Sequence, residues 1–202
     1  AGKSSTLAAV VNHINSSRAA HIITIEDPIE ILHESRRSLV TQREVTRHTG
    51  SCAGALRAAL REDPDVLLVG EMRDLETVEL ALTAAETGHL VLATLHAGSA
   101  VQSVSRLVDV FPAGKQQQVR ATLAESLSAV VSQVLLPRHG GGRLPVTEVL
   151  RATTAVRSLI REGKTHQLSG VMQASSQAGM ITMQQRMRQL QDSLAINQED
   201  LL

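Results

Sequence analysis

The chain has 202 residues, of which 43% are hydrophobic and 20% are charged, and its 20 Lys and Arg residues balance its 20 Asp and Glu residues. This composition predicts a folded globular protein and excludes a disordered chain. The single cysteine, Cys52, excludes an intrachain disulfide and a zinc site built from several cysteines. The sequence has no secretion signal pattern and no apolar run near the roughly 18 residues of a membrane span, so we expect a cytoplasmic protein without a transmembrane segment. Zero net charge and the lack of Trp and Tyr argue against nucleic-acid binding.

The first half of the chain alternates between helical and extended patterns. Apolar residues at three- and four-residue spacing predict helices at 4–15, 53–62, 76–87 and 101–110. Extended patterns predict strands at 21–26, 38–45, 65–70 and 90–95. Segment 38–45 fits either a hairpin partner or an edge strand, whereas DVLLVG at 65–70 and LVLATL at 90–95 are typical of strands buried on both faces of a parallel sheet. The rhythm predicts an α/β fold with a parallel-rich sheet.

The second half of the chain follows a different pattern. A helix is predicted at 116–132, and the extended runs 134–136 and 145–149 flank the turn His-Gly-Gly-Gly, which predicts a glycine-rich hairpin. Three amphipathic helices are predicted to follow, at 153–162, 166–174 and 182–192. We therefore divide the chain into a core at residues 1–111 and a second part at residues 112–202, which holds the remainder of the core, the hairpin and a small helical subdomain.

The first residues contain Gly2-Lys3-Ser4-Ser5 directly before a helical pattern. In a phosphate-binding loop, backbone amides and a helix N-terminus surround the phosphates, the lysine reaches the β and γ groups, and the serine holds Mg²⁺. An ordinary capped helix is the alternative, because Gly-Lys-Ser alone is a weak signal. The strand and the first glycine of such a loop are not in the sequence, so we expect the chain to start inside the loop.

Three predicted strands carry a polar residue at or directly after their carboxyl ends, namely Glu26, Glu71 and His96. The carboxyl ends of parallel strands meet at one edge of a sheet, and ligands of open α/β sheets bind beyond that edge. There, Glu71 would hold Mg²⁺, Glu26 would deprotonate a water, and His96 would reach a γ-phosphate. A surface carboxylate at Glu71 and a turn cap at Glu26 are the alternatives. Together with the Gly-Lys-Ser segment, these residues favour Mg²⁺-dependent hydrolysis of a phosphoanhydride.

Four longer motifs resemble, in order and spacing, the Walker A, aspartate-box, Walker B and histidine-box elements of secretion ATPases: GKSSTL, IITIEDPIE, ALREDPDVLLVGEMRDLET and TGHLVLATLH. Among these ATPases, the sequence is most similar to the PilT-type retraction ATPases of type IV pili. The segment AVRSLIRE at 155–162 resembles the AIRNLIRE segment of the retraction branch, with departures at Val156 and Ser158. The resemblance implies a RecA-like P-loop NTPase core with a parallel-rich sheet, followed by a small helical C-terminal subdomain.

The resemblance also implies a site that binds ATP and Mg²⁺. Lys3 would bind the β and γ phosphates, with Gly2 and Ser5 in the same loop, and Ser4 would bind Mg²⁺. Glu26 would be the catalytic base, Glu71 would belong to the Mg²⁺ shell, and His96 would sense the γ-phosphate. On the helix predicted at 153–162, Val156, Leu159 and Ile160 would be buried, and Arg157 and Arg161 would point outward in a region linked to retraction.

The family further implies an assembly and a location. Such ATPases form homo-hexameric rings that act on an inner-membrane platform protein of the pilus, so we expect a cytoplasmic protein peripheral to the inner membrane that powers pilus retraction and twitching motility. Family members carry an additional N-terminal domain, a first core strand and a complete loop, so we expect little ATPase activity from these 202 residues alone. An accessory, assembly or type II secretion ATPase and a non-catalytic interaction module remain alternatives, and a nucleic-acid translocase is a weaker one.

Overall fold

The computed structural model describes residues 2–138 and 140–192, which form two compact units. The sheet unit comprises Lys3–Leu95, and the hairpin unit begins at His96 and also includes Gly2. This division follows the contacts between residues, and the predicted domain boundary after residue 111 stays a prediction. Within the described residues, no helix is both long and apolar enough to cross a bilayer.

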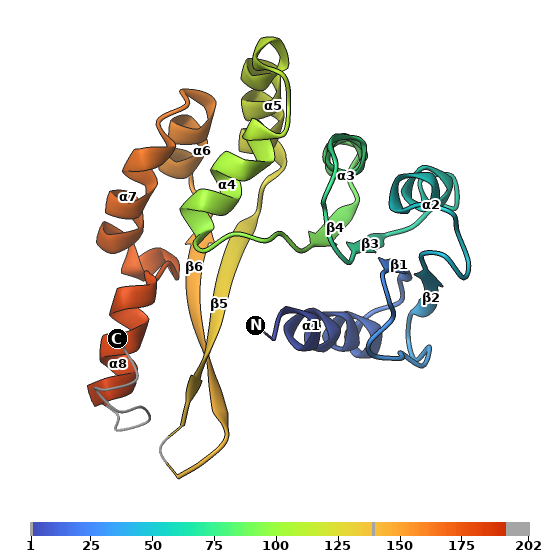
Figure 1. Cartoon of the computed structure of the whole chain (residues 1–202), viewed down its shortest axis with the longest axis horizontal. Coiled ribbons are helices and arrows are strands. Elements are labelled where there is room, and N and C mark those ends of the chain that lie inside the picture. Colours follow the sequence, from blue (N-terminus) through green and yellow to red (C-terminus); the bar gives the residue numbers. More distant parts are fainter. Residues whose placement is uncertain (1, 139, 193–202) are drawn as a thin grey trace. The chain divides into compact units, whose positions relative to one another are not determined.

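The sheet unit is a parallel four-stranded sheet with a helix on one face and two on the other (Figure 1). The strand order is β2-β1-β3-β4, and every neighbouring pair is parallel. In chain order, the elements are α1 (Lys3–Ser17), β1 (His21–Glu26), β2 (Leu39–Glu44), α2 (Cys52–Ala59), β3 (Val66–Val69), α3 (Leu75–Glu86) and β4 (Leu90–Ala93). The predicted α/β fold with a parallel-rich sheet is confirmed.

Alternate residues of the central strands bury opposite faces of this sheet. On β1, Ile22 packs in a core with Val11 of α1, and Ile23 packs in a second core with Leu56 of α2. Successive side chains of a strand point to opposite faces, so a strand covered on both sides must be apolar throughout. Both isoleucines are fully buried. Burial on both faces explains why the central strands β1 and β3 are largely apolar along their length.

One of the two edge strands matches its prediction and the other does not. β2 pairs with β1 in parallel, so the edge strand is confirmed and the hairpin alternative is wrong. β4 was expected to be buried on both faces, and this is wrong, because Leu90 is 37% exposed and the rest of the strand is half-buried. β4 pairs only with β3 within the described residues, so one of its sides lacks a neighbouring strand to cover it.

The hairpin unit consists of an antiparallel ribbon and short helices (Figure 1). Its elements are α4 (Ala100–Asp109), α5 (Ala113–Ser126), β5 (Ala129–Pro137), β6 (Arg143–Arg151), α6 (Thr154–Arg161), the 3₁₀ turn η1 (Thr165–Gln167), α7 (Leu168–Ala174), the 3₁₀ turn η2 (Ser176–Ala178) and α8 (Met183–Asp192). The predicted hairpin is confirmed, although the ribbon is longer than expected and runs from the pair Ala129–Arg151 to the pair Pro137–Arg143. His139, in the predicted turn, lies outside the described residues.

The predicted helix at 116–132 ends too late. α5 stops at Ser126, and Leu127 has extended backbone angles, with φ at −62° and ψ at 130°. Val130 and Val131 then pair in β5, because β-branched side chains fit a pleated ribbon better than a helix. The correction shortens the helix and lengthens the strand that follows it.

Glu148 joins two helices of the hairpin unit. Its side chain lies on β6 and is only 9% exposed. One carboxylate oxygen accepts from the backbone amide of Ala100, the first residue of α4, at 2.6 Å. The other accepts from the amide of Met183, the first residue of α8, at 3.3 Å. These amides have no partner inside their own helices, so the carboxylate satisfies them and complements both helix dipoles.

Arg157 corrects a further prediction. It was expected to point outward from the helix now seen as α6, but its guanidinium donates to the backbone oxygens of Ala124 and Glu125, the latter at 2.6 Å. These carbonyls lie in the last turn of α5, where oxygens lack helical partners and a positive charge is favourable. Arg161 does remain exposed and lies 3.9 Å from the Glu125 carboxylate. Arg157 therefore acts as a cap within the fold.

Candidate active site at the carboxyl edge of the sheet

Lys3 lies at the carboxyl edge of the sheet. It is the first residue of α1, and its ammonium donates to the carbonyl oxygen of Leu95, just beyond β4, at 2.9 Å. The next two residues, Ser4 and Ser5, are exposed in the first turn of α1, which carries no acidic residue. A helix N-terminus that carries a lysine and no carboxylate favours an anion, because the free amides and the helix dipole add to the positive charge.

Gly2 precedes this helix with a left-handed backbone. Its φ is 74°, a value that favours glycine. A Cβ atom on Gly2 would also lie 2.6 Å from the side-chain nitrogen of Gln133, within the hairpin unit. The backbone angle therefore favours glycine at this position of the predicted phosphate loop.

Glu26 ends β1 and is held by two donors. The hydroxyl of Thr24 donates to Glu26 Oε1 at 2.7 Å, and the side-chain amide of Gln42 donates to the same oxygen at 3.1 Å. Thr24 and Glu26 lie two residues apart on one face of the strand, the face that buries Ile22 against α1. In the parallel register Thr24 pairs with Gln42, so β2 brings the amide to the same face. The carboxylate is half-buried.

Gly70 brings the end of β3 close to Glu26. Its amide donates to the carbonyl of Ile25 at 2.8 Å. A Cβ atom on Gly70 would lie 3.2 Å from the Cα of Glu26, so a larger residue would push the two strand ends apart. The glycine thus allows a close approach of two backbones, and it places the next residue, Glu71, at the same edge as Glu26.

Glu71 forms an ion pair with Arg73 in the short connection between β3 and α3. The Arg73 guanidinium approaches Glu71 Oε2 through two nitrogens, at 2.6 and 2.7 Å. This carboxylate raises the pKa of the Arg73 guanidinium, which stays charged. The Arg73 side chain is 65% exposed and that of Glu71 is 22% exposed, so the pair lies at the surface, where an ion pair contributes little to stability.

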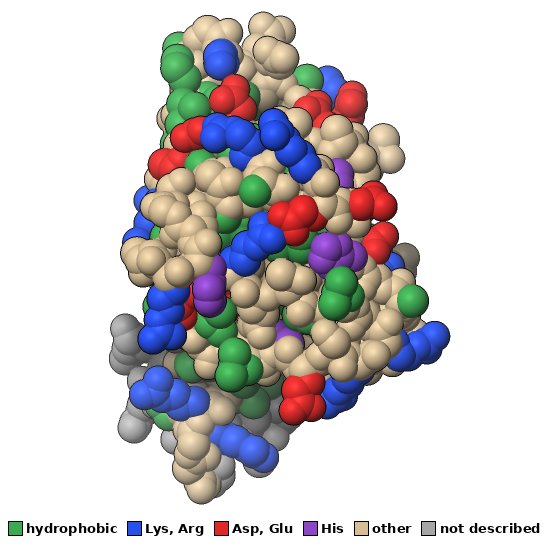
Figure 2. Space-filling model, turned by 90° about the vertical axis from the view of Figure 1, so that its right-hand side faces the viewer, with side chains coloured by type: hydrophobic (Ala, Val, Ile, Leu, Met, Phe, Trp, Pro, Cys, Tyr) green, Lys and Arg blue, Asp and Glu red, His purple; other side chains and the backbone are tan. Residues whose placement is uncertain are grey.

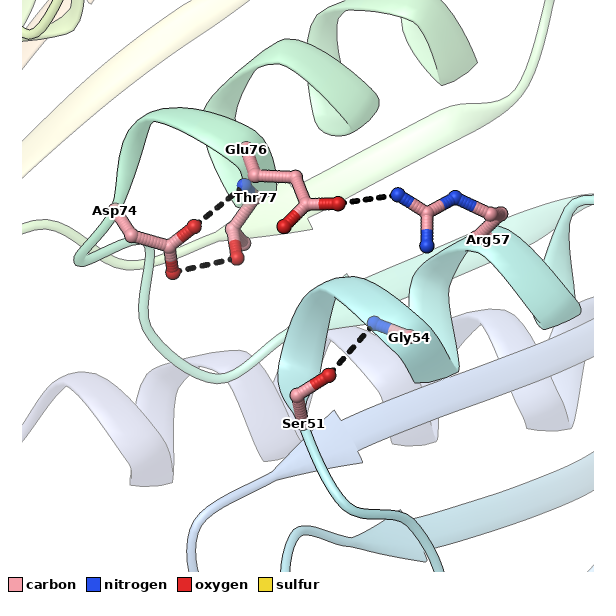
Figure 3. A network of polar contacts seen from close by, with 6 residues as sticks. All are labelled: Ser51, Gly54, Arg57, Asp74, Glu76 and Thr77. Carbon is pink, nitrogen blue, oxygen red and sulfur yellow. Dashed lines mark hydrogen bonds and ion pairs between the residues drawn. The ribbon is translucent and has the colours of Figure 1, made fainter.

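The polar network drawn in Figure 3 fixes α2, which follows the edge strand β2, and α3, which follows the central strand β3. Asp74 accepts from the amide and the hydroxyl of Thr77, at 2.9 and 2.8 Å, and so caps α3. Ser51 caps α2 in the same way, by accepting from the amide of Gly54 at 3.0 Å. Arg57 of α2 pairs with Glu76 of α3 (Figure 3). Since α3 begins at Leu75, its cap also anchors the connection that carries Glu71.

The end of β4 is tied to the same edge. The hydroxyl of Thr94 donates to the carbonyl of Gly70, and the amide of Met72 donates to the carbonyl of Thr94 at 3.0 Å. With the bond from Lys3 to Leu95, the described contacts bring Lys3 and the ends of β1, β3 and β4 together. Glu26 and Glu71 therefore share one edge with Lys3, as predicted, and their roles stay predictions.

His96 follows Leu95 and begins the hairpin unit. It is exposed, and its carbonyl accepts from the guanidinium of Arg106 on α4 at 2.6 Å. Among the described residues, no group of three or more His, Cys, Asp or Glu side chains could by itself hold a metal ion. Mg²⁺ in nucleotide sites is usually held by one or two side chains and by phosphate oxygens, so serine and carboxylate at this edge suit it.

Sequence reasoning missed several residues of this edge. Thr24 carried a usable signal, since it is the one polar residue inside the apolar run of β1 and lies two positions before Glu26. Gln42 and Thr94 carried none, because their contacts depend on the register between strands. Arg73 lies two residues after Glu71, and the sequence gave no reason to single it out.

The chain matches the family model of the type II/IV secretion system protein over residues 1–197. It belongs to this family. A twitching motility protein of Neisseria gonorrhoeae is 58% identical over 190 residues, which cover 94% of this chain and 51% of that protein. The type IV pilus retraction ATPase PilT of Pseudomonas aeruginosa is 55% identical over 182 residues, 90% of this chain and 53% of the relative. The recognised likeness to PilT-type ATPases of the secretion ATPase family is confirmed.

A solved structure has the same fold as this secretion system family member. The pilus retraction motor PilT, crystallised with ADP, superposes with a TM-score of 0.92 at 52% identity, and the match covers 98% of this chain and 56% of that one. This confirms the predicted fold class. The chain spans about half the length of the relatives it matches.

Proposed function

We propose that the protein containing this chain hydrolyses ATP with Mg²⁺ and uses the energy to retract type IV pili. One observation carries the proposal: Lys3, Glu26 and Glu71 lie at the carboxyl edge of the sheet, in a chain that matches a pilus retraction motor with a TM-score of 0.92. The high identity to proteins of twitching motility favours this motor over other secretion ATPases.

The residues at the start of α1 fit a nucleotide phosphate. We propose that Gly2, Lys3 and Ser5 bind the phosphates and that the Ser4 hydroxyl is a ligand of Mg²⁺, with Glu71 in the same ion's shell. The exposed first turn of α1 and its lack of acidic residues support this placement. When Mg²⁺ is bound, it neutralises charge on the phosphates. Lys3 would then exchange its bond to the Leu95 carbonyl for a phosphate oxygen.

We propose Glu26 as the base that activates the attacking water. Its carboxylate accepts a proton from water as the water oxygen bonds to the γ-phosphorus and the bond from that phosphorus to the ADP oxygen breaks. Its half-buried position at the end of β1, on the same face as α1, supports this role. His96 would contact the γ-phosphate and sense its presence.

The active form would be a homo-hexamer in the cytoplasm, peripheral to the inner membrane at the pilus base, where it acts on the platform protein. An accessory or assembly ATPase of the same family is the closest alternative. Loss of pilus retraction in a deletion strain, with pilus assembly intact, would support the motor for retraction. Loss of assembly instead would favour the alternative.

A nucleic-acid translocase is the weaker alternative. Figure 2 shows basic and acidic side chains in neighbouring positions on one face, and the chain has zero net charge. A translocase normally presents a basic surface to the phosphate backbone. Tight, salt-sensitive DNA binding would favour the translocase.

The decisive test uses the complete gene product that carries these residues. Lys3→Ala should weaken ATP binding and turnover together, because the ammonium contacts the phosphates in the proposed complex. Glu71→Gln should keep ADP binding and lower turnover at least about 100-fold, because the Mg²⁺ that would stabilise charge in the transition state loses an anionic member of its shell. Release of phosphate and fluorescent-ADP titration measure the two effects. Normal turnover in both variants would contradict the proposal.

The 202-residue chain alone should hydrolyse ATP slowly, since it matches only about half of each relative. It could then act only as a module that binds other copies or the platform protein. Steady Mg²⁺-dependent phosphate release from this chain would contradict the expectation of low activity.

A further inference from the structure

We propose that Gln42 and Thr24 are positioning residues that fix the carboxylate of Glu26 for proton transfer. The inference rests on the proposed function, in which Glu26 is the base. Both residues donate to the same oxygen, Oε1, at 3.1 and 2.7 Å. Neither belongs to the predicted phosphate loop or to the predicted Mg²⁺ shell.

The orientation of the Gln42 amide is determined by its three partners. Its oxygen accepts from the backbone amide of His33 at 2.7 Å, and its nitrogen donates to the carbonyl of Ile31 at 3.0 Å and to Glu26 Oε1. Turning the amide over would set its oxygen against two acceptors and its NH₂ group against a donor. The amide therefore presents an N–H group to Glu26 in one orientation only.

Thr24 supplies the second donor from the strand itself. Its side chain is fully buried, so its hydroxyl needs a hydrogen-bond partner, and Glu26 is the partner that the structure provides. Thr24 is also the register partner of Gln42, which explains why both donors reach the same oxygen. Two donors from two strands restrict rotation of the carboxylate more strongly than one would.

The second oxygen of Glu26 has a different environment. Within residues 2–138 and 140–192, Oε2 makes no hydrogen bond or ion pair. The arrangement assigns the two oxygens separate tasks: Oε1 is held by the protein, and Oε2 takes the proton. A general base must lie within hydrogen-bond distance of the proton it removes, and a misplacement of about 1 Å can cost about 100-fold in rate.

Gln42 also connects Glu26 to the segment that follows β1. Residues 27–38 join β1 to β2, and the side chain of Gln42 holds this segment at Ile31 and His33. Glu44, two residues farther along β2, accepts from the amide of Ile29 at 3.0 Å. Loss of Gln42 would therefore loosen both the segment and the carboxylate, and the test must separate these effects.

The test compares three variants of the complete gene product in steady-state ATP hydrolysis. Thr24→Val removes a donor to Glu26 without affecting the 27–38 segment. Gln42→Glu keeps an acceptor for the His33 amide but sets an oxygen against both Glu26 Oε1 and the Ile31 carbonyl, so Thr24→Val is the variant that isolates the effect on the carboxylate. Thr24→Ser keeps the hydroxyl. We expect kcat to fall about 10-fold or more in Thr24→Val and further in Gln42→Glu. KM and ADP affinity should stay unchanged, and Thr24→Ser should retain most of the activity.

Gln117→Ala is the matched control, since this glutamine is exposed on α5. In a Glu26→Gln background, where the base is lost, Thr24→Val should cause no further loss of turnover, because the two residues act through one group. Normal kcat in both Thr24→Val and Gln42→Glu would overturn the inference, as would an additive loss in that background. Absence of ATP hydrolysis by the unmodified protein would instead overturn the proposed function.

Discussion

Glu26 in the sheet unit and Glu148 in the hairpin unit are both carboxylates on strands, yet their oxygens are used differently. Both oxygens of Glu148 accept from backbone amides at the starts of helices, and the side chain is 9% exposed. Glu26 is half-buried, and only one of its oxygens has a hydrogen-bond partner among the described residues. A carboxylate with both oxygens satisfied suits a structural role, whereas one with an available oxygen suits chemistry.

The strongest test of this contrast is the exchange of each glutamate for glutamine. Glu26→Gln should lower ATP turnover in the gene product at least about 100-fold, because an amide oxygen is a poor base. Its thermal unfolding midpoint should change little, since glutamine can still accept from Thr24 and Gln42. Turnover at the parental rate would show that Glu26 is not the base.

Glu148→Ala should show the opposite behaviour. It leaves the buried amide of Ala100 and the half-buried amide of Met183 without an acceptor and should lower the free energy of unfolding by about 3 kcal/mol. Urea unfolding followed by circular dichroism would measure this loss. Hydrogen exchange at the starts of α4 and α8 should rise. Unchanged exchange there would mean that the carboxylate does not support these helices.

Arg157 and Arg161 provide a matched pair on α6. Arg157→Ala removes the donor to two carbonyls of α5 and should lower the free energy of unfolding by about 1–2 kcal/mol. Arg161→Ala breaks an exposed ion pair with a separation of 3.9 Å and should cost less than about 0.5 kcal/mol. The same urea titration serves both. Equal losses would contradict the assignment of Arg157 as a helix cap.

Asp74 offers a smaller effect that depends on pH. Burial alone would raise the pKa of Asp74, but hydrogen bonds from Thr77 stabilise its charged form and lower this pKa overall. A pKa that is lower in the folded state stabilises the protein above the unfolded value, near 4, and this contribution is lost as the pH falls through the folded value. Asp74→Ala should lower the free energy of unfolding by about 1 kcal/mol at pH 7, as typical for a helix cap.

The control for Asp74→Ala is the same unfolding measurement at low pH. The difference in unfolding free energy between Asp74→Ala and the unmodified protein should shrink below about pH 4, as the carboxylate becomes protonated. Asp74→Asn, whose side-chain oxygen can still accept from Thr77, should keep most of the stability at pH 7. A difference that stays constant from pH 7 to pH 3 would rule out the charged cap.

Much of the sheet unit could be predicted, because its helices and strands follow from local patterns of residue type and spacing. The strand at 21–26 was predicted with the bounds it has, and the strand at 65–70 with one extra residue at each end. Continuous apolar runs identify central strands, and the polar residues that follow them mark the carboxyl edge. β4 reads like a central strand, but burial depends on the neighbours that a strand has, which its own residues do not specify.

The hairpin unit was harder to predict, since helical and extended patterns overlap in its sequence. The helical pattern of α5 continues through residues 127–132, yet residues 129–132 pair with β6, because a long ribbon offers them more contacts than a helix extension. In the same way, Arg157 occupies a position that helical periodicity places on the outer face. Contact with α5 decides its role instead.

By itself, the sequence determined the alternation of helices and strands, the parallel sheet, the order of the motifs and the residues at the strand ends, because these follow from periodicity and residue type along the chain. Only the tertiary structure decided which groups hold Glu26, why Gly70 must be small, and which charges of the hairpin unit serve as helix caps. The physical reason is that hydrogen-bond partners far apart in sequence meet only when strand register and packing bring them within about 3 Å.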